Sequence, residues 1–102
     1  PRGSAIVVDG ERIGFVVVRR LDDPPHLLLD HLYVLPSHQG RGLGAAVLAD
    51  VFAQADAERL PVRVGALRGS RSNRFYERHG FVRVASAEWD HFYERPPAAA
   101  PR

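Results

Sequence analysis

The chain has 102 residues, a length that fits one domain, and its 45% hydrophobic and 25% charged residues are typical of a globular protein. The net charge of +2 is too small for the dense basic face that nucleic-acid binding requires. Cysteine is absent, which excludes disulfides and thiolate chemistry, and no apolar run approaches the roughly 20 residues that span a bilayer, so we expect a cytoplasmic protein without a membrane partner.

The two ends of the chain are expected to lie outside the fold. Residues 1–4 (PRGS) match the end of a cleavable tag, and we assign them no function. Residues 96–102 (PPAAAPR) offer no large side chains to bury, which predicts a disordered tail. A single domain is therefore predicted over residues 5–95.

Three strands are predicted in the first third of the chain, over residues 5–9, 11–20 and 27–35. Asp9-Gly10 is a typical hairpin turn between the first two. Gly14 permits a bulge or a close backbone approach inside the second strand. Residues 21–26 (LDDPPH) are predicted to form a turn, because two adjacent prolines are not expected inside a strand.

The third predicted strand is almost continuously apolar, which is typical of a central strand covered on both faces. Regular alternation divides its side chains between two faces. One face would carry Asp30, Leu32 and Val34. The other would carry His31, Tyr33 and Leu35. Asp30 is thereby predicted to share a face with apolar neighbours.

A long amphipathic helix is predicted from Gly40 or Arg41 to Leu60, where Pro61 prevents its continuation. Apolar residues repeat along it at helical spacing: Leu43, Val47, Val51, Leu48, Phe52 and Ala55. A strand follows over residues 62–67. A strand, a helix and a strand in succession predict a right-handed crossover, so the two strands should be parallel.

A second helix is predicted over residues 73–79, with Ser70 or Ser72 as its N-cap and Gly80 as its left-handed end. Two last strands are predicted over residues 81–85 and 90–95. The order is β-β-β-α-β-α-β-β, an α+β fold with a mixed antiparallel and parallel sheet flanked by helices.

The turn between the third strand and the long helix, residues 39–44 (QGRGLG), predicts an anion site. Glycine at 40, 42 and 44 lets main-chain N–H groups approach a bulky anion, and the helix dipole and Arg41 add favourable charge. A Walker loop is excluded because lysine is absent, and the spacing differs from the dinucleotide fingerprint. A diphosphate is the expected ligand.

A cluster of arginines supports an anionic ligand nearby: Arg68, Arg71, Arg74 and Arg78.

Two segments resemble motifs of the GCN5-related N-acetyltransferases (GNAT). Residues 32–36 (LYVLP) followed by 39–44 (QGRGLG) are similar to motif A, and residues 73–81 (NRFYERHGF) are similar to motif B. The two lie in the family's order with a strand between them. The resemblance covers roughly residues 5–95 and implies the GNAT fold.

The resemblance implies acetyl-CoA as the co-substrate and a small-molecule or peptide amine as the acceptor, with no metal. It implies cofactor-binding roles for Leu32, Tyr33, Val34, Gln39, Gly40, Arg41, Gly42, Leu43, Gly44 and Asn73. Main-chain groups of Leu32 and Val34 would bind the pantetheine arm and the acetyl group, next to a strand that splays away. Asn73 would bind near the same arm.

Two residues are candidate proton carriers. Tyr76 occupies the position of the family's general acid, and a phenol suits this role because it stays protonated at neutral pH. Asp30 is the leading candidate base for the acceptor amine, and an ion pair with an arginine is the competing interpretation. His31 is the second candidate base, because imidazole is a common general base, but it is predicted to lie on the opposite face.

The chain lacks the strand and two helices that usually precede the hairpin in this family, so it is either a short member or a fragment. Their absence would expose a sheet edge and part of one face, and a homodimer that covers this surface is a further expectation. A non-catalytic acyl-CoA-binding or regulatory module is the alternative function.

Overall fold

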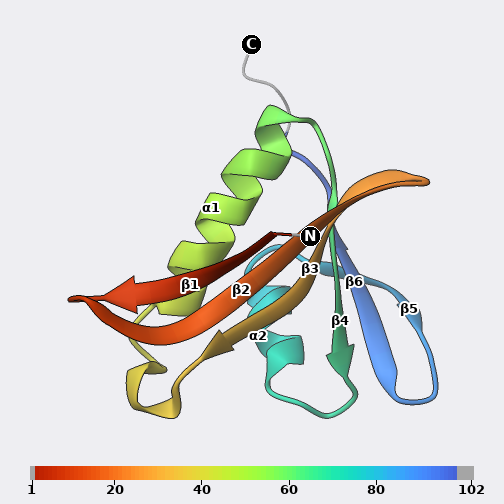
Figure 1. The fold of residues 1–102 in the computed structure, drawn as a ribbon. Coiled ribbons are helices and arrows are strands. Elements are labelled where there is room, and N and C mark those ends of the chain that lie inside the picture. The colour runs from red at the N-terminus through yellow and green to blue at the C-terminus, as the bar shows by residue number, and fades with distance from the viewer. Residues whose placement is uncertain (1, 99–102) are drawn as a thin grey trace.

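The computed structural model describes residues 2–98, which form one six-stranded sheet and two α-helices (Figure 1). The elements are β1 (Arg2–Val8), β2 (Glu11–Asp22), β3 (Pro25–Val34), a 3-10 turn (Pro36–His38), α1 (Leu43–Ala57), β4 (Val62–Leu67), α2 (Ser72–Arg78), β5 (Val82–Ser86) and β6 (Asp90–Arg95). The predicted element order and the α+β class are confirmed.

The sheet has the strand order β1-β2-β3-β4-β6-β5. The β3–β4 contact is parallel, as the crossover through α1 predicts, and the other neighbouring strands within residues 2–98 are antiparallel. The parallel contact has two residue pairs, Leu27 with Val62 and Leu28 with Arg63. Beyond these pairs β3 and β4 separate toward their carboxyl ends, which leaves a gap in the middle of the sheet.

Both helices pack on one face of the sheet and share one apolar core. Phe52 of α1 lies 5.6 Å from Phe81, which follows α2, measured between ring centroids. The core draws on both helices and on the central strands: Leu27, Leu29, Leu48, Val51, Ala55, Leu60, Val62, Val64, Ala66, Tyr76, Phe81 and Tyr93. The opposite face of the sheet has neither helix.

Helix α1 is shorter than predicted at both ends. It begins after Gly42, whose φ of 76° is left-handed. It ends at Ala57 because Arg59 takes a φ of 56° and the Leu60 N–H donates to the Ala55 carbonyl at 2.8 Å. The helix therefore ends before Pro61, with a left-handed residue and a hydrogen bond from Leu60 to Ala55 that are typical of helix C-termini.

A β-bulge in β3 overturns the predicted alternation. His31 pairs with Val17 and Leu29 pairs with Val18, so Asp30 is the extra residue. A bulge shifts the side-chain phase by one position. Leu29 and Leu32 consequently both pack against the helix-side core. Asp30 instead lies with His31 on the other face, so the prediction that Asp30 shares a face with Leu32 and Val34 is wrong.

Gly14 allows β2 and β3 to approach closely, as its position in the strand predicts. A Cβ on Gly14 would lie only 2.1 Å from the main-chain oxygen of Tyr33. The pairing of β1 with β2 also shifts at this level, so that Ile6 pairs with Gly14 and Val7 with Arg12. Any other residue at position 14 would force these strands apart.

The termini differ from the expectation in detail. Strand β1 includes Arg2, Gly3 and Ser4, which pair with β2, so it starts before residue 5. In the predicted tail the Ala98 N–H donates to the Asp56 carboxylate at 2.9 Å, while residues 99–102 lie outside the described part. Neither helix described here has the length and apolar character needed to cross a membrane.

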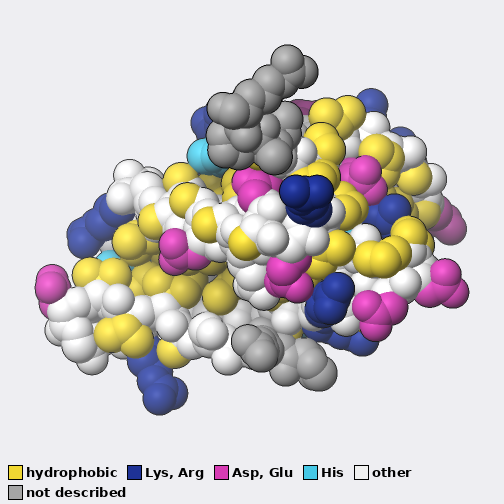
Figure 2. All heavy atoms as spheres, turned by 90° about the horizontal axis from the view of Figure 1, so that it is seen from above, with side chains coloured by type: hydrophobic (Ala, Val, Ile, Leu, Met, Phe, Trp, Pro, Cys, Tyr) yellow, Lys and Arg dark blue, Asp and Glu magenta, His cyan; other side chains and the backbone are white. Residues whose placement is uncertain are grey.

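A second groove, of about 340 Å³, lies between α1 and the outer strands β1 and β2. Hydrophobic side chains gather on the hairpin side of the molecule (Figure 2). The groove is lined by Ser4, Ala5, Ile6, Val16, Val18, Val47, Asp50, Val51 and Gln54. None of its lining residues belongs to the glycine turn.

Candidate functional site

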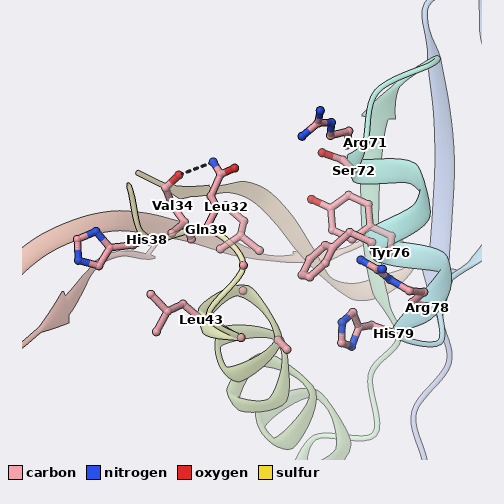
Figure 3. Close-up of a pocket in the computed structure, with 15 residues that line it drawn as sticks. Leu32, Val34, His38, Gln39, Leu43, Arg71, Ser72, Tyr76, Arg78 and His79 are labelled. Carbon is pink, nitrogen blue, oxygen red and sulfur yellow. Dashed lines mark hydrogen bonds between the residues drawn. The ribbon is translucent and has the colours of Figure 1, made fainter. Parts of the chain in front are cut away.

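The larger cavity, of about 480 Å³, lies where the end of β3, the glycine turn, the start of α1 and helix α2 meet (Figure 3). Its lining comprises Leu32, Val34, His38, Gln39, Gly40, Gly42, Leu43, Gly44, Ala45, Arg71, Ser72, Phe75, Tyr76, Arg78 and His79. Segments that lie far apart in the sequence are therefore brought to one site.

The glycine turn gives this cavity an uncapped helix N-terminus. Gly40 and Gly42 have φ values of 80° and 76°, which favour glycine, and no side chain within the described range caps α1. The first helical hydrogen bond runs from Ala46 to the Gly42 carbonyl, at 3.0 Å. The N–H groups of the preceding helical residues have no partner within the helix and lie at the cavity, an arrangement that suits a phosphate.

The edge of β3 beside the cavity is open. The Leu35 N–H donates to the Ile13 carbonyl at 2.7 Å, which fixes the hydrogen-bonding phase of the β2–β3 ladder. Because alternate residues of an antiparallel pair point their N–H and C=O groups away from the partner, those of Leu32 and Val34 face the gap left by β4. An extended ligand can pair with β3 here as an added strand.

Gln39 ties the glycine turn to this strand. Its side-chain amide donates to the Val34 carbonyl at 2.8 Å (Figure 3). One of the main-chain groups predicted to bind the pantetheine arm is therefore already paired. The Leu32 N–H and C=O and the Val34 N–H stay directed at the gap.

Helix α2 forms the opposite wall. A Cβ on Gly44 would lie 3.0 Å from the Phe75 ring, so the glycine lets α1 and α2 come together. Tyr76 is 7% exposed, and its hydroxyl points into the cavity toward β3 (Figure 3). Burial raises the pKa of Tyr76 above its usual value, which keeps the phenol protonated.

Asn73 has a different place from the one predicted. Its amide nitrogen donates to the Leu67 carbonyl at 2.9 Å and to the Ser70 carbonyl at 3.0 Å, and its oxygen accepts from the Tyr93 hydroxyl at 2.8 Å. Asn73 does not line the cavity. It fixes the start of α2 to the end of β4 and, through the Tyr93 side chain, to β6, in place of the predicted serine cap.

Three more predicted site residues lie outside the cavity lining: Asp30, Tyr33 and Arg41. The bulge turns Asp30 to the helix-free face, where its carboxylate lies 3.9 Å from the Arg19 guanidinium. Tyr33 is on the same face, 5.7 Å from Phe15 between ring centroids. Arg41 is exposed on the turn.

Several lining residues had no predicted role in the cofactor site: His38, Ala45, Arg71, Ser72, Phe75, Arg78 and His79. The arginine cluster was the signal for two of them. Arg71 and Arg78 line the cavity, whereas Arg68 donates instead to the Ala87 carbonyl at 3.2 Å. Phe75 lies in the segment 73–81 that resembles motif B, and this segment was the signal for it.

Among residues 2–98, no three His, Asp or Glu side chains are grouped so that they could hold a metal ion.

Comparison with known proteins relates this geometry to one family. The model of the acetyltransferase (GNAT) domain matches residues 1–83. An uncharacterized N-acetyltransferase of Mycobacterium tuberculosis is 37% identical over 75 residues, which are 72% of this chain and 47% of the relative. The chain thus spans about half the length of the curated relatives it matches.

Solved structures share the fold. The PaiA N-acetyltransferase of Thermoplasma acidophilum, in complex with coenzyme A, has a TM-score of 0.81 at 19% identity, over 90% of this chain and 58% of that one. A GNAT-family acetyltransferase of Desulfovibrio desulfuricans has a TM-score of 0.80 at 25% identity, over 94% of this chain and 69% of that one. The ribosomal-protein-S18-alanine N-acetyltransferase of Escherichia coli has a TM-score of 0.81 at 17% identity, over 98% of this chain and 71% of that one.

Proposed function

Because the chain belongs to the GNAT acetyltransferase family, we propose that it transfers an acetyl group from acetyl-CoA to a primary amine. The observation that carries this proposal is the open edge of β3 beside the cavity, where Leu32 and Val34 offer main-chain groups to an extended ligand. The pantetheine arm of coenzyme A contains two amides in an extended chain, and it fits such an edge.

The remainder of the cavity suits the nucleotide end of the same molecule. The N–H groups at the start of α1 would hold the pyrophosphate, with Gly40 and Gly42 allowing the close approach. Arg71 and Arg78, which line the cavity from α2 and the turn before it, would supply positive charge for phosphate groups. The residues present therefore fit acetyl-CoA.

The residues of this chain would divide the chemistry between them. Acetyl-CoA, when bound, supplies an activated thioester. The Leu32 N–H, directed at the gap, would donate to the thioester oxygen and stabilise the charge that develops on it. The amine nitrogen forms the new bond to carbon as the carbon–sulfur bond breaks, and Tyr76 donates its proton to the departing sulfur.

The amine must lose a proton during this step, and Asp30 is our proposed acceptor of it. The bulge directs Asp30 to the face of the sheet opposite the cavity, two residues before Leu32. An amine that enters the gap from that face would meet the carboxylate on its way to the thioester. The ion pair with Arg19, long and half-exposed, is too weak to withdraw the carboxylate from this role.

Two measurements on the purified chain test the proposal. Calorimetry should detect coenzyme A binding, and a thiol-release assay with acetyl-CoA and a panel of amines should detect turnover. Binding without thiol release from any amine would favour a non-catalytic acyl-CoA-binding module. Absence of binding would reject the assignment of the cavity itself.

A further inference from the structure

A polar cluster on the β5–β6 hairpin lies apart from the candidate acetyl-CoA site, at one edge of the sheet (Figure 1). His91 pairs with Ala66 of β4 and with Ser86 of β5, so it faces the same side of the sheet as the buried Ala66. We call four residues the hairpin cluster: Arg68, Arg83, Ser86 and His91. None of them lines the cavity of the candidate site.

His91 is the centre of the hairpin cluster. Its Nδ1 lies 2.7 Å from the Ser86 hydroxyl oxygen, and its Nε2 lies 3.3 Å from a guanidinium nitrogen of Arg83. Because a guanidinium can only donate hydrogen bonds, Nε2 is the acceptor and the imidazole carries its single proton on Nδ1. The hydrogen-bond partner of the Arg83 cation is therefore a neutral imidazole.

Arg68 adds a second cation to the hairpin cluster. Its guanidinium donates to the carbonyl of Ala87 at 3.2 Å, directly after Ser86 in the chain. Neither Arg68 nor Arg83 forms an ion pair with a carboxylate among residues 2–98. A phosphate-type oxyanion is a stronger partner for a guanidinium than a carbonyl or an imidazole, because its hydrogen bonds are charge-assisted.

The protonation of His91 reflects these neighbours. Burial lowers the pKa of His91 below its usual 6.5, and the charges of Arg83 and Arg68 lower it further, while Glu77 of α2 acts in the opposite direction with the smallest effect. His91 is accordingly neutral near pH 7 in the free protein. A dianion between the two arginines would offset their charge and favour the imidazolium form.

We propose that the hairpin cluster binds a tetrahedral oxyanion of the phosphate class, which replaces the imidazole as the acceptor for Arg83. The guanidinium of Arg68 donates to the same anion. The released Nε2 of His91 takes up a proton from solvent and becomes a further donor to the anion. Binding is thus coupled to the uptake of one proton at His91.

Sulfate is the probe for the test, because its charge does not change over the pH range in which an imidazole titrates. NMR of the histidine ring resonances, at constant ionic strength, should show His91 saturating with a Kd of about 1 mM near pH 6. Saturating sulfate should move the midpoint of the His91 titration up by about one pH unit. The affinity for sulfate should then fall about tenfold as the pH rises through this range.

The His91 resonances separate this site from the start of α1, since sulfate bound at the glycine turn would not displace the His91 imidazole. His26 is the internal reference, because its Nδ1 lies 2.7 Å from the Pro24 carbonyl oxygen, and its resonances should not respond. Arg83→Gln should weaken sulfate binding about tenfold by removing a charge-assisted donor. Arg12→Gln is the matched control, since it removes the same charge from an exposed position on β2, across the sheet.

A His91 titration that sulfate leaves unchanged would overturn the proposal. Equal weakening in Arg83→Gln and Arg12→Gln would also overturn it, because the response would then come from an adventitious ion only.

A parallel titration with O-phosphoserine identifies the source of the oxyanion. Tighter binding than sulfate would support a phosphate ester as the ligand, and equal or weaker binding would support a free oxyanion. Neither titration depends on acetyl transfer, so failure of the proposed function would leave this proposal intact, and the reverse also holds.

Discussion

The side-chain amide of Gln39 donates to the main-chain oxygen of Val34 at 2.8 Å. This bond joins the glycine turn, where a pyrophosphate would lie, to the strand edge where a pantetheine arm would pair. The two halves of the candidate cofactor site are therefore held in register by one side chain. Their separation is set before any ligand arrives.

We expect Gln39→Leu to weaken coenzyme A binding while leaving the fold intact. An exposed hydrogen bond contributes about 1 kcal/mol, so the affinity should fall about fivefold in calorimetry. Gln54→Leu is the control, since Gln54 is exposed on α1 away from the cavity. An unchanged affinity would show that the turn keeps its position without Gln39.

Gly42→Val should abolish coenzyme A binding and also lower stability. Its φ of 76° is left-handed, which costs a residue with a Cβ about 1–2 kcal/mol, and the new side chain would stand at the cavity. Gly10→Val separates the two effects, because Gly10 has a φ of 80° in the β1–β2 turn, with open space around it. It should lose similar stability in urea yet bind coenzyme A normally. Equal loss of binding in both variants would contradict the phosphate-seat interpretation.

Tyr76→Phe should lower kcat by about 10² or more, as the loss of a general acid does, with the affinity for coenzyme A nearly unchanged. Tyr93 is a second buried tyrosine, and Tyr93→Phe serves as the control variant. It loses the hydrogen bond to Asn73 and about 1 kcal/mol of stability, but it should keep its kcat. Equal rates in Tyr76→Phe and the unmodified chain would remove Tyr76 from the mechanism.

The free energy of unfolding should decrease in alkaline solution because the same two tyrosines have raised pKa values in the folded protein. Burial raises the pKa of Tyr76 and of Tyr93 in the folded protein above 10.0. The unfolded chain then releases these protons first, so stability is complete below about pH 10 and is lost as the pH rises further. Urea unfolding between pH 9 and 11 should show a shallower decline for Tyr76→Phe. An identical decline would contradict the raised pKa.

Asn73→Ala should destabilise the fold by about 1–3 kcal/mol, because it removes bonds to Leu67, Ser70 and Tyr93 together. Ser70→Ala removes only the side-chain contact at 3.2 Å and should have a much smaller effect on urea unfolding. If Asn73 also bound the pantetheine arm directly, the affinity of Asn73→Ala for coenzyme A would fall by more than the loss of folded protein explains.

The sequence predicts most of the fold because strong local signals mark its elements. The bounds of β4 and β6 agree with the prediction, since both segments alternate and are bounded by turn residues. The insertion of β6 between β4 and β5 could not be predicted, because neighbours in a sheet are chosen by packing rather than by chain order. The left-handed turn at Arg59, which shortens α1, also lacks a glycine to signal it.

The candidate site was predictable where the chemistry is in the main chain. The glycine turn follows from residue types and spacing, whereas the open edge at Leu32 and Val34 was implied by the family resemblance. The position of Asp30 does not, because a β-bulge changes the facing of a residue without changing its identity. Asn73 occupies a position of motif B, but its role depends on its hydrogen-bond partners Leu67, Ser70 and Tyr93, which the sequence does not identify.

The bulge at Asp30 has a consequence for the tolerance of this segment to insertion and deletion. Removal of Asp30 would restore strict alternation and leave Leu32 and Val34 facing the core, because Leu29 and Leu32 already share that face with two residues between them. The main-chain groups at the gap would then keep their direction, and only the carboxylate would be lost. Removal of Tyr33, where the strand alternates regularly, would instead turn Val34 away from the core. The segment should therefore tolerate the loss of one residue at the bulge but not further along the strand.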